Sequence, residues 1–284
     1  MITAGPTTRL PVRTALGESP VWDDRRQALW FVDIEARRLH CMAWPAATLQ
    51  TWEMPEPAAS LALCDSGRLL VALTRAVHVF DPADGSLRLF AEVEHGRPGN
   101  RLNDGKVAPD GSFWVGSMDE ATKSQPTGAL YQVRPDGSVH RQLDGLVTSN
   151  GLAWSADGRH MYHSDSRGRF IRRHGYGEGG ELSDGVLVAS PTAEEGRPDG
   201  GATDMAGGYW SAGVSAGCLN RHAADGAVQR LPLPVDHPTM PCFGGPGLRT
   251  LFVTSLVTAD PHASGALLCL DAGVAGVPVA RFPL

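Results

Sequence analysis

The amino-acid sequence predicts an all-β protein, a six-bladed β-propeller whose four-stranded blades surround a central channel. Three observations lead to this prediction: a turn-and-strand pattern that occurs six times, a second hairpin signal within the repeats, and breaker residues dispersed along the chain. The 284 residues include 34 Gly and 21 Pro, and scattered breakers favour many short strands over long helices. Few segments have apolar residues at the i, i+3, i+4, i+7 spacing of an amphipathic helix.

Each repeat begins with a turn that is followed by an apolar or aromatic strand. The repeats start with the segments 22–33, 64–73, 108–116, 155–163, 204–211 and 244–253. Five of the turns contain the glycines Gly67, Gly111, Gly158, Gly207 and Gly247. These glycines are 44, 47, 49 and 40 residues apart, which is the ~40–50-residue period of a propeller blade.

A second turn signal within the repeats separates two further strands. In the second repeat, the turn at 81–85 separates a strand at 76–80 from a strand at 87–90. Two hairpins make four strands, which is one blade. We therefore expect residues 1–284 to form a single six-bladed domain, with a strand from 10 to 14 completing the last blade.

Composition excludes several classes of partner. The net charge of −6 argues against nucleic acid and against an anionic membrane surface. The first 16 residues lack the apolar core of a signal peptide, and no apolar run approaches the ~18 residues of a membrane span. The five Cys are odd in number and have no C-x-x-C spacing, which indicates reduced, mostly buried thiols. We expect a cytoplasmic monomer or weak homo-oligomer with no nucleic-acid and no membrane partner.

Four oxygen-bearing side chains share one position in the repeat. Asn103, Asn150 and Asp199 each lie eight residues before the turn glycine of their repeat, and Glu18 lies eight residues before Arg26 in the first turn. In a propeller, equal offsets place residues at the same mouth of the channel, so these four should face one another. Carboxylate and amide oxygens suit Ca²⁺, Mg²⁺, Mn²⁺ or a similarly bound Zn²⁺ or Fe²⁺.

A structural interpretation of these residues is also available. Asn and Asp before Gly are common turn formers, and the remaining two repeats have Ala59 and Thr239 at the same offset, neither a strong metal ligand. Four oxygen donors at one repeat position nevertheless favour a metal site, because the repeat makes them neighbours in space.

The chain resembles the SMP-30/gluconolactonase/luciferin-regenerating-enzyme-like family, which includes regucalcin and bacterial sugar lactonases. Five motifs carry the resemblance, in order, from the first to the fifth of the six repeats. They are Leu16-Gly-Glu-Ser-Pro-Val-Trp22, Arg101-Leu-Asn-Asp-Gly-Lys-Val107, Gly116-Ser-Met118, Ser149-Asn-Gly-Leu-Ala-Trp154 and Arg197-Pro-Asp-Gly200. The resemblance implies one divalent metal ion in the channel, with Glu18, Asn150 and Asp199 as its direct ligands.

The resemblance also implies a set of substrate contacts. Arg101 and Asn103 would hold the sugar, with Asn103 near the metal, and Asp104 is an expected contact beside them. Some relatives have a further acid after the Gly-Ser-Met element. Here Asp119 and Glu120 are both available, and the sequence does not choose between them.

The expected chemistry is metal-dependent opening of a sugar lactone, an aldonolactone, to the aldonic acid. A lactone is an internal ester, and a metal ion can polarise its carbonyl and activate a water molecule. Asp199 is the candidate general base, and Arg101 would hold sugar hydroxyls or stabilise the developing oxyanion. Two alternatives stay open: a metal-dependent arylesterase or phosphotriesterase-like hydrolase, and a non-catalytic metal-binding propeller.

Two further motifs lack the structural context that their chemistry needs. The segment 213–217 fits G-x-S-x-G, but strand-like residues follow it where a nucleophile elbow has a helix, so we expect a tight hairpin. The segment 175–180 fits G-x-G-x-x-G but opens no helix, so we expect a loop between strands.

Overall fold

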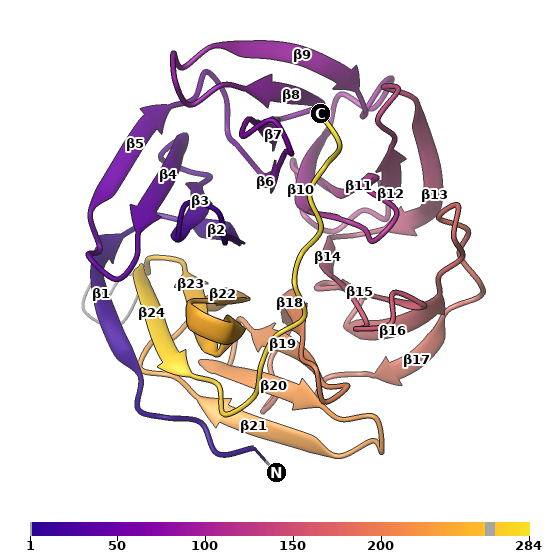
Figure 1. The fold of residues 1–284 in the computed structure, drawn as a ribbon. Helices are drawn as coiled ribbons and strands as arrows, with labels where there is room; N and C mark the ends of the chain where they lie inside the picture. The colour runs from indigo at the N-terminus through magenta and orange to yellow at the C-terminus, as the bar shows by residue number, and fades with distance from the viewer. Residues whose placement is uncertain (1, 259–264) are drawn as a thin grey trace.

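The computed structural model describes residues 2–258 and 265–284, and these form a six-bladed β-propeller. Their 24 strands make six four-stranded antiparallel sheets arranged as a ring, which confirms the predicted fold (Figure 1). The helical structure of the described residues is limited to a three-residue 3-10 helix, η1 (Pro246–Leu248). No helix in this part of the chain is long and apolar enough to cross a bilayer.

Each blade is an antiparallel meander, and its strands run outward from the channel in chain order, apart from the last blade. Blade 1 contains β2 (Gly17–Asp23), β3 (Ala28–Asp33), β4 (Arg38–Ala43) and β5 (Leu49–Glu53). Blade 2 contains β6 (Ser60–Leu63), β7 (Leu69–Ala72), β8 (Ala76–Phe80) and β9 (Leu87–Glu92). Blade 3 contains β10 (Asn100–Val107), β11 (Phe113–Asp119), β12 (Gly128–Val133) and β13 (Val139–Leu146). Blade 4 contains β14 (Ser149–Trp154), β15 (His160–Asp165), β16 (Phe170–Gly175) and β17 (Val186–Ala189). Blade 5 contains β18 (Pro198–Thr203), β19 (Tyr209–Gly213), β20 (Cys218–His222) and β21 (Val228–Pro232). Blade 6 contains β22 (Pro238–Gly244), β23 (Thr250–Ser255), β24 (Ala266–Asp271) and β1 (Thr8–Arg13).

The ring closes by pairing the first strand of the chain with the last. β1 lies antiparallel to β24, with Thr8 opposite Cys269. The sequence predicted this closing strand at 10–14, and it begins two residues earlier. Because the outermost strand of blade 6 comes from the other end of the chain, the two ends of the ring are held together by backbone hydrogen bonds.

The innermost strands are irregular near their first residues. In five blades the pairing of the innermost strand with its neighbour shifts register at this point, and β6 of blade 2 is the exception. The shifts lie between Glu18 and Val21, Leu102 and Gly105, Asn150 and Ala153, Pro198 and Gly201, and Pro238 and Pro241. A β-bulge changes the direction in which a side chain points. These bulges therefore set the direction of the side chains at the repeat position that carries the oxygen donors.

The core consists of apolar clusters between neighbouring blades. Trp52 of blade 1 packs edge-on against Phe80 of blade 2 with ring centroids 5.8 Å apart, and Trp114 packs edge-on against Tyr176. The five cysteines are all buried and unpaired, as the sequence predicted. Burial raises the pKa of the Cys64 thiol to about 12, so this thiol stays protonated.

The G-x-S-x-G and G-x-G-x-x-G motifs have the structures that the sequence predicted for them. The residues between Gly213 and Cys218 form a tight hairpin that joins β19 to β20, with these two residues paired. The glycine-rich segment 175–180 begins at the last residue of β16 and continues into the connection to β17. Neither motif precedes a helix in the described residues.

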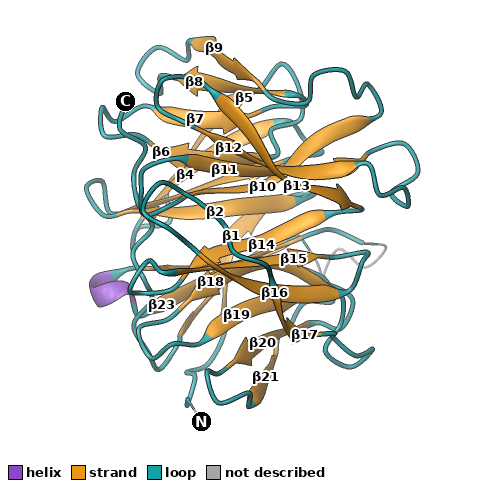
Figure 2. Cartoon of the chain, turned by 90° about the vertical axis from the view of Figure 1, so that its right-hand side faces the viewer, coloured by secondary structure: helices purple, strands orange, loops and turns teal. Residues whose placement is uncertain are grey.

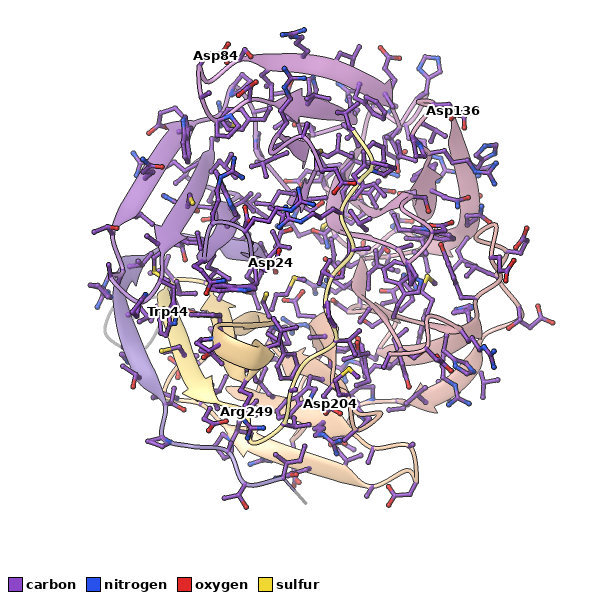
Figure 3. The ribbon with its side chains drawn as sticks, viewed as in Figure 1. Asp24, Trp44, Asp84, Asp136, Asp204 and Arg249 are labelled. Atoms are coloured by element: carbon purple, nitrogen blue, oxygen red, sulfur yellow. The ribbon has the colours of Figure 1, made fainter. Side chains whose placement is uncertain are left out.

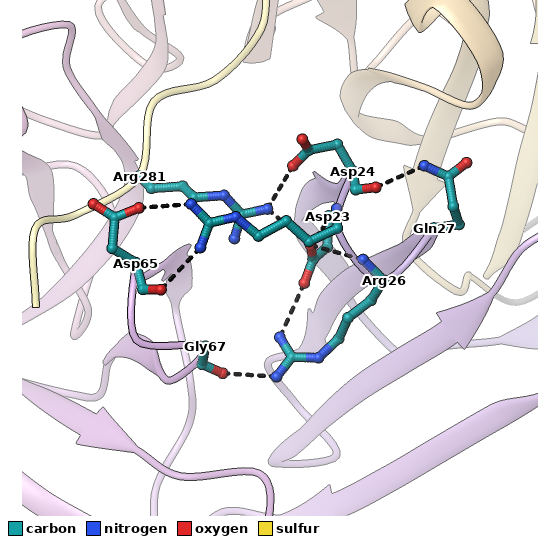
Figure 4. Close-up of polar contacts among 8 residues, drawn as sticks. Asp23, Asp24, Arg26, Gln27, Asp65, Gly67 and Arg281 are labelled. Carbon is teal, nitrogen blue, oxygen red and sulfur yellow. Dashed lines mark hydrogen bonds and ion pairs between the residues drawn. The ribbon is translucent and has the colours of Figure 1, made fainter.

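A C-terminal strap, residues 275–284, crosses the ring and was not predicted from the sequence. Figure 1 shows it passing over one mouth of the channel, and Figure 2 shows the C-terminus on the same face as η1. The strap pairs with blade 5 through Gly276 and Asp204, and with blade 2 through Phe282 and Cys64. Near its end, Arg281 donates to a carboxylate oxygen of the buried Asp23 at 2.8 Å (Figure 4).

The strap contributes one side chain to the core, and truncation of that side chain should destabilise the ring. The Phe282 side chain is fully buried and packs edge-on against Phe90, with centroids 5.5 Å apart. Phe282→Ala should lower the free energy of unfolding by about 3–5 kcal/mol, because it leaves a cavity in the core. The control Leu284→Ala, at a side chain that is 37% exposed, should change it little. Urea unfolding midpoints would test this, and equal midpoints for Phe282→Ala and the parent would contradict it.

Candidate functional site

Side chains from different blades meet where the innermost strands begin, at the mouth opposite the strap. Asn103 of β10 donates from Nδ2 to Oδ1 of Asn150 on β14 at 3.0 Å, and to the Ser149 carbonyl at 2.9 Å. Asn150 donates in turn to the Ser166 hydroxyl at 2.7 Å. The fold thus brings together two amides that are 47 residues apart in the sequence.

Glu18 on β2 and Asp199 on β18 approach the same region from blades 1 and 5. Loss of solvent raises the Glu18 pKa well above its usual value, and Asp199 and Asp104 raise it further. Burial raises the Asp199 pKa to about 8, with Asp104 as the next cause, while Arg197 and Arg101 oppose the shift. Asp104 thus raises the pKa of both Glu18 and Asp199, so these carboxylates lie in one poorly solvated region.

This donor set fits a hard divalent cation. The described residues contain no group of three or more His, Cys, Asp or Glu arranged around a metal position, so the available donors are a mixture of carboxylates and amides. One oxygen of Asp104, Oδ1, is buried without a hydrogen-bond partner among the described residues. A cation would offset the crowded negative charge, and oxygen donors of this kind are those that Ca²⁺ and Mg²⁺ prefer.

Arg101 is fixed beside the amides by three contacts. Its Nη1 donates to Oδ1 of Asn103 at 2.8 Å and to the Leu102 carbonyl at 2.9 Å. Its Nε donates to the carboxylate of Glu120, an exposed residue in the loop after β11. Arg101 therefore links the channel amides to an acid at the mouth.

The two acids that the sequence left as alternatives have different surroundings. Asp119 accepts hydrogen bonds from the hydroxyl of Thr122 and from the backbone N–H groups of Ala121, Ser124 and Gln125. These bonds lower the Asp119 pKa, with the Thr122 hydroxyl as the largest cause. The Asp119 carboxylate shapes its own loop, whereas that of Glu120 reaches Arg101.

Asp104 is buried beside Asn103 and contacts the neighbouring blade. Its Oδ2 accepts the backbone N–H of Leu152 on the neighbouring blade at 2.9 Å, and the residue is 4% exposed. This hydrogen bond ties blade 3 to blade 4 directly behind the paired amides. Asp104 thus adds negative charge to the site and raises the pKa values of Glu18 and Asp199.

Lys106 is a residue of the site that sequence reasoning missed. Its Nζ crosses the channel from blade 3 and donates to the Gly201 carbonyl of blade 5 at 2.6 Å. Burial lowers the Lys106 pKa, and Asp104 opposes that shift. Strand alternation could have identified Lys106, because residues two apart in a strand share a face, as Asp104 and Lys106 do. A cavity of about 350 Å³ lies beyond Lys106, between the channel and the strap.

The arrangement has the parts needed for acid–base chemistry on an oxygen-rich ligand. A carboxylate with a pKa near 8, such as that of Asp199, titrates close to neutrality, where general acids and bases work best. Arg101 offers planar charged donors on one side of this carboxylate. Perturbed carboxylates beside fixed donors in a channel are typical of functional sites.

Comparison with known proteins finds similarity over most of the chain. Residues 16–257 match the model of the SMP-30/Gluconolactonase/LRE-like region. The 6-deoxy-6-sulfogluconolactonase of Pseudomonas putida is 37% identical over 245 residues, which cover 85% of this chain and 84% of that protein. The L-arabinolactonase of Azospirillum brasilense is 35% identical over 292 residues, covering 98% and 96%. A solved structure, the calcium-binding protein regucalcin of Agrobacterium tumefaciens, superposes with a TM-score of 0.87 at 28% identity, covering 96% of this chain and 94% of that one.

The crowded carboxylates predict an unusual effect of Asp199→Asn in chelator-treated protein. The folded state holds on Asp199 a proton that the unfolded chain releases near pH 4, so this group destabilises the fold as pH rises from about 4 to about 8. Asp199→Asn should therefore raise the free energy of unfolding at pH 8 by at least about 1 kcal/mol, and the gain should vanish near pH 4.

Asp136→Asn is a control that should change the free energy of unfolding at pH 8 in the opposite direction. Asp136 lies at the outer rim of the ring (Figure 3), and the Ser138 hydroxyl lowers its pKa. Its stabilising contribution is present above the unfolded-state pKa and is lost on acidification, so this variant should be less stable than the parent at pH 8. Thermal unfolding in EDTA at several pH values checks both variants, and a pH-independent effect of Asp199→Asn would contradict the account.

Proposed function

Because the chain belongs to the SMP-30/gluconolactonase/LRE-like family, we propose that it is a sugar lactonase, which hydrolyses an aldonolactone to the aldonic acid with the help of one divalent metal ion. The observation that carries the proposal is the meeting of Glu18, Asp199 and the amides of Asn103 and Asn150 beside Arg101. The names of two relatives, a sulfogluconolactonase and an arabinolactonase, support the substrate class.

We assign the metal ion to Glu18, Asn150 and Asp199. When bound, a divalent ion supplies Lewis acidity that polarises a carbonyl and acidifies water. The regucalcin relative is named as a calcium-binding protein, which supports a hard cation, and Ca²⁺, Mn²⁺, Mg²⁺, Zn²⁺ and Fe²⁺ all remain compatible with oxygen donors. The ion would also offset the burial and the neighbouring carboxylate charge that raise the Glu18 and Asp199 pKa values.

Four side chains have separate roles in the proposed hydrolysis. Asp199 accepts a proton from the attacking water at a carboxylate oxygen, as a general base. Arg101 donates to sugar hydroxyls or to the oxygen that gains negative charge during attack. Asn103 holds Arg101 in place through its Oδ1 and joins it to Asn150 through its Nδ2. Lys106 fixes the Gly201 carbonyl and thereby the backbone near Asp199.

Metal removal tests the proposed chemistry. After EDTA treatment the protein should stay folded and lose hydrolysis of glucono- and arabinonolactones, and one or more divalent ions should restore it. Asp199→Asn should lower kcat by about 10²- to 10⁴-fold, the usual contribution of a general base, and Asp136→Asn should not. Metal-independent turnover, or faster turnover of phenyl acetate or a phosphotriester than of any lactone, would contradict the proposal.

Glu120 rather than Asp119 is the acid that we expect to contact substrate. Glu120→Gln should raise KM for the lactone about 2- to 5-fold, as expected for an exposed charged contact, and leave the thermal midpoint unchanged. Asp119→Asn should instead lower the thermal midpoint, because its carboxylate accepts the hydrogen bonds that order its loop. A KM effect of Asp119→Asn without loss of stability would reverse the assignment.

A further inference from the structure

Three arginines gather at the site mouth on blades 4 and 5. Arg167 and Arg169 belong to the turn between β15 and β16, and Arg197 belongs to the segment that leads into β18. The β15–β16 turn lies at the site mouth because β15 runs antiparallel to β14 and its last residue pairs with Ser149, next to Asn150. The three arginines therefore share a mouth with the proposed metal ligands.

The arginines of the two blades are close to one another. β15 and β18 are neighbours, and the Ser164 hydroxyl of β15 donates to the Asp199 carbonyl at 3.4 Å. Burial lowers the pKa of Arg197, and Arg167 and Arg169 lower it further, while Asp199 opposes them. The guanidinium groups are thus near enough to repel one another and to feel the acid at the site.

No carboxylate neutralises this arginine cluster. Within residues 2–258 and 265–284, none of the three guanidinium groups forms an ion pair or a hydrogen bond. Two acids on the same loops accept backbone N–H groups instead: Asp165 accepts four, and Glu195 accepts that of Thr192 at 2.8 Å.

The equivalent turn of blade 1 shows that this charge excess is not a requirement of the turn. There Arg37 has the same backbone angle as Arg169, a φ of 54°. Asp33 accepts backbone N–H groups as Asp165 does. The blade 1 turn also contains Glu35, and the adjacent Arg38 pairs with Glu53 at 2.9 Å, so its charge is balanced.

We propose that Arg167, Arg169 and Arg197 recognise an anionic group on the lactone substrate, carried on the carbon chain away from the lactone carbonyl. This inference rests on the proposed lactonase function and narrows its substrate class to phosphorylated, sulfonated or carboxylated sugar lactones. Guanidinium groups present planar paired donors that match the oxygens of such anions. A bound anion would also relieve the mutual repulsion of the cluster.

Paired substrates test this site. The parent should prefer 6-phosphoglucono-1,5-lactone to glucono-1,5-lactone in kcat/KM, and raised salt should weaken only the preference for the charged lactone. The triple variant Arg167→Gln, Arg169→Gln, Arg197→Gln should lower the ratio of the two kcat/KM values about 10- to 100-fold, the range of lost charged hydrogen bonds. Arg37→Gln should leave both values unchanged.

If the triple variant does not fold, the exposed single variants Arg167→Gln and Arg169→Gln should each lower the same ratio. An unaltered ratio in the variants, or a parent without preference, would overturn the inference.

Equilibrium binding separates failure of the anion site from failure of the lactonase. Calorimetry with the open-chain acids 6-phosphogluconate and gluconate requires no turnover. If neither lactone is hydrolysed but 6-phosphogluconate binds the parent more tightly than the triple variant, the anion site stands without the hydrolase. If gluconolactone is hydrolysed but the parent binds the two acids equally, the lactonase stands and the anion site is wrong.

Discussion

The common direction of the six innermost strands is the constraint on which the rest of the structure depends. Every blade is an antiparallel meander, so once one innermost strand begins at a given mouth of the channel, all of them do. Pairing of β1 with β24 closes the ring and fixes this arrangement. The contact between Asn103 and Asn150 follows from it, because the two residues hold the same position in successive blades. The bulges in five of these strands then determine which side chains face the axis.

The electrostatics of the site mouth are divided between its centre and one side. Carboxylates crowd the axis, where low solvation raises the pKa values of Glu18 and Asp199. The arginine cluster lies beside them on blades 4 and 5, and within the described residues its guanidinium groups form no ion pair or hydrogen bond. The net charge of −6 conceals this positive region. A cation at the centre and an anionic substrate group at the side would together complement both charges.

The sequence predicted the fold because each blade repeats the same physical signals. A turn glycine such as Gly111, with φ of 83°, recurs before an apolar strand in repeat after repeat. The C-terminal strap has no repeat to reveal it, and its place depends on tertiary contacts such as the burial of Phe282. The shared offset of the oxygen donors predicted their neighbourhood. It could not separate Asp119 from Glu120, because the difference lies in how the loop folds around the Asp119 carboxylate.

Anomalous scattering from a crystal grown with Mn²⁺ tests the central claim most directly. The account predicts one strong peak on the channel axis, with oxygen atoms of Glu18, Asn150 and Asp199 at about 2.0–2.6 Å from it. An axis without a peak, or an ion bound at a position that these three side chains do not reach, would contradict it.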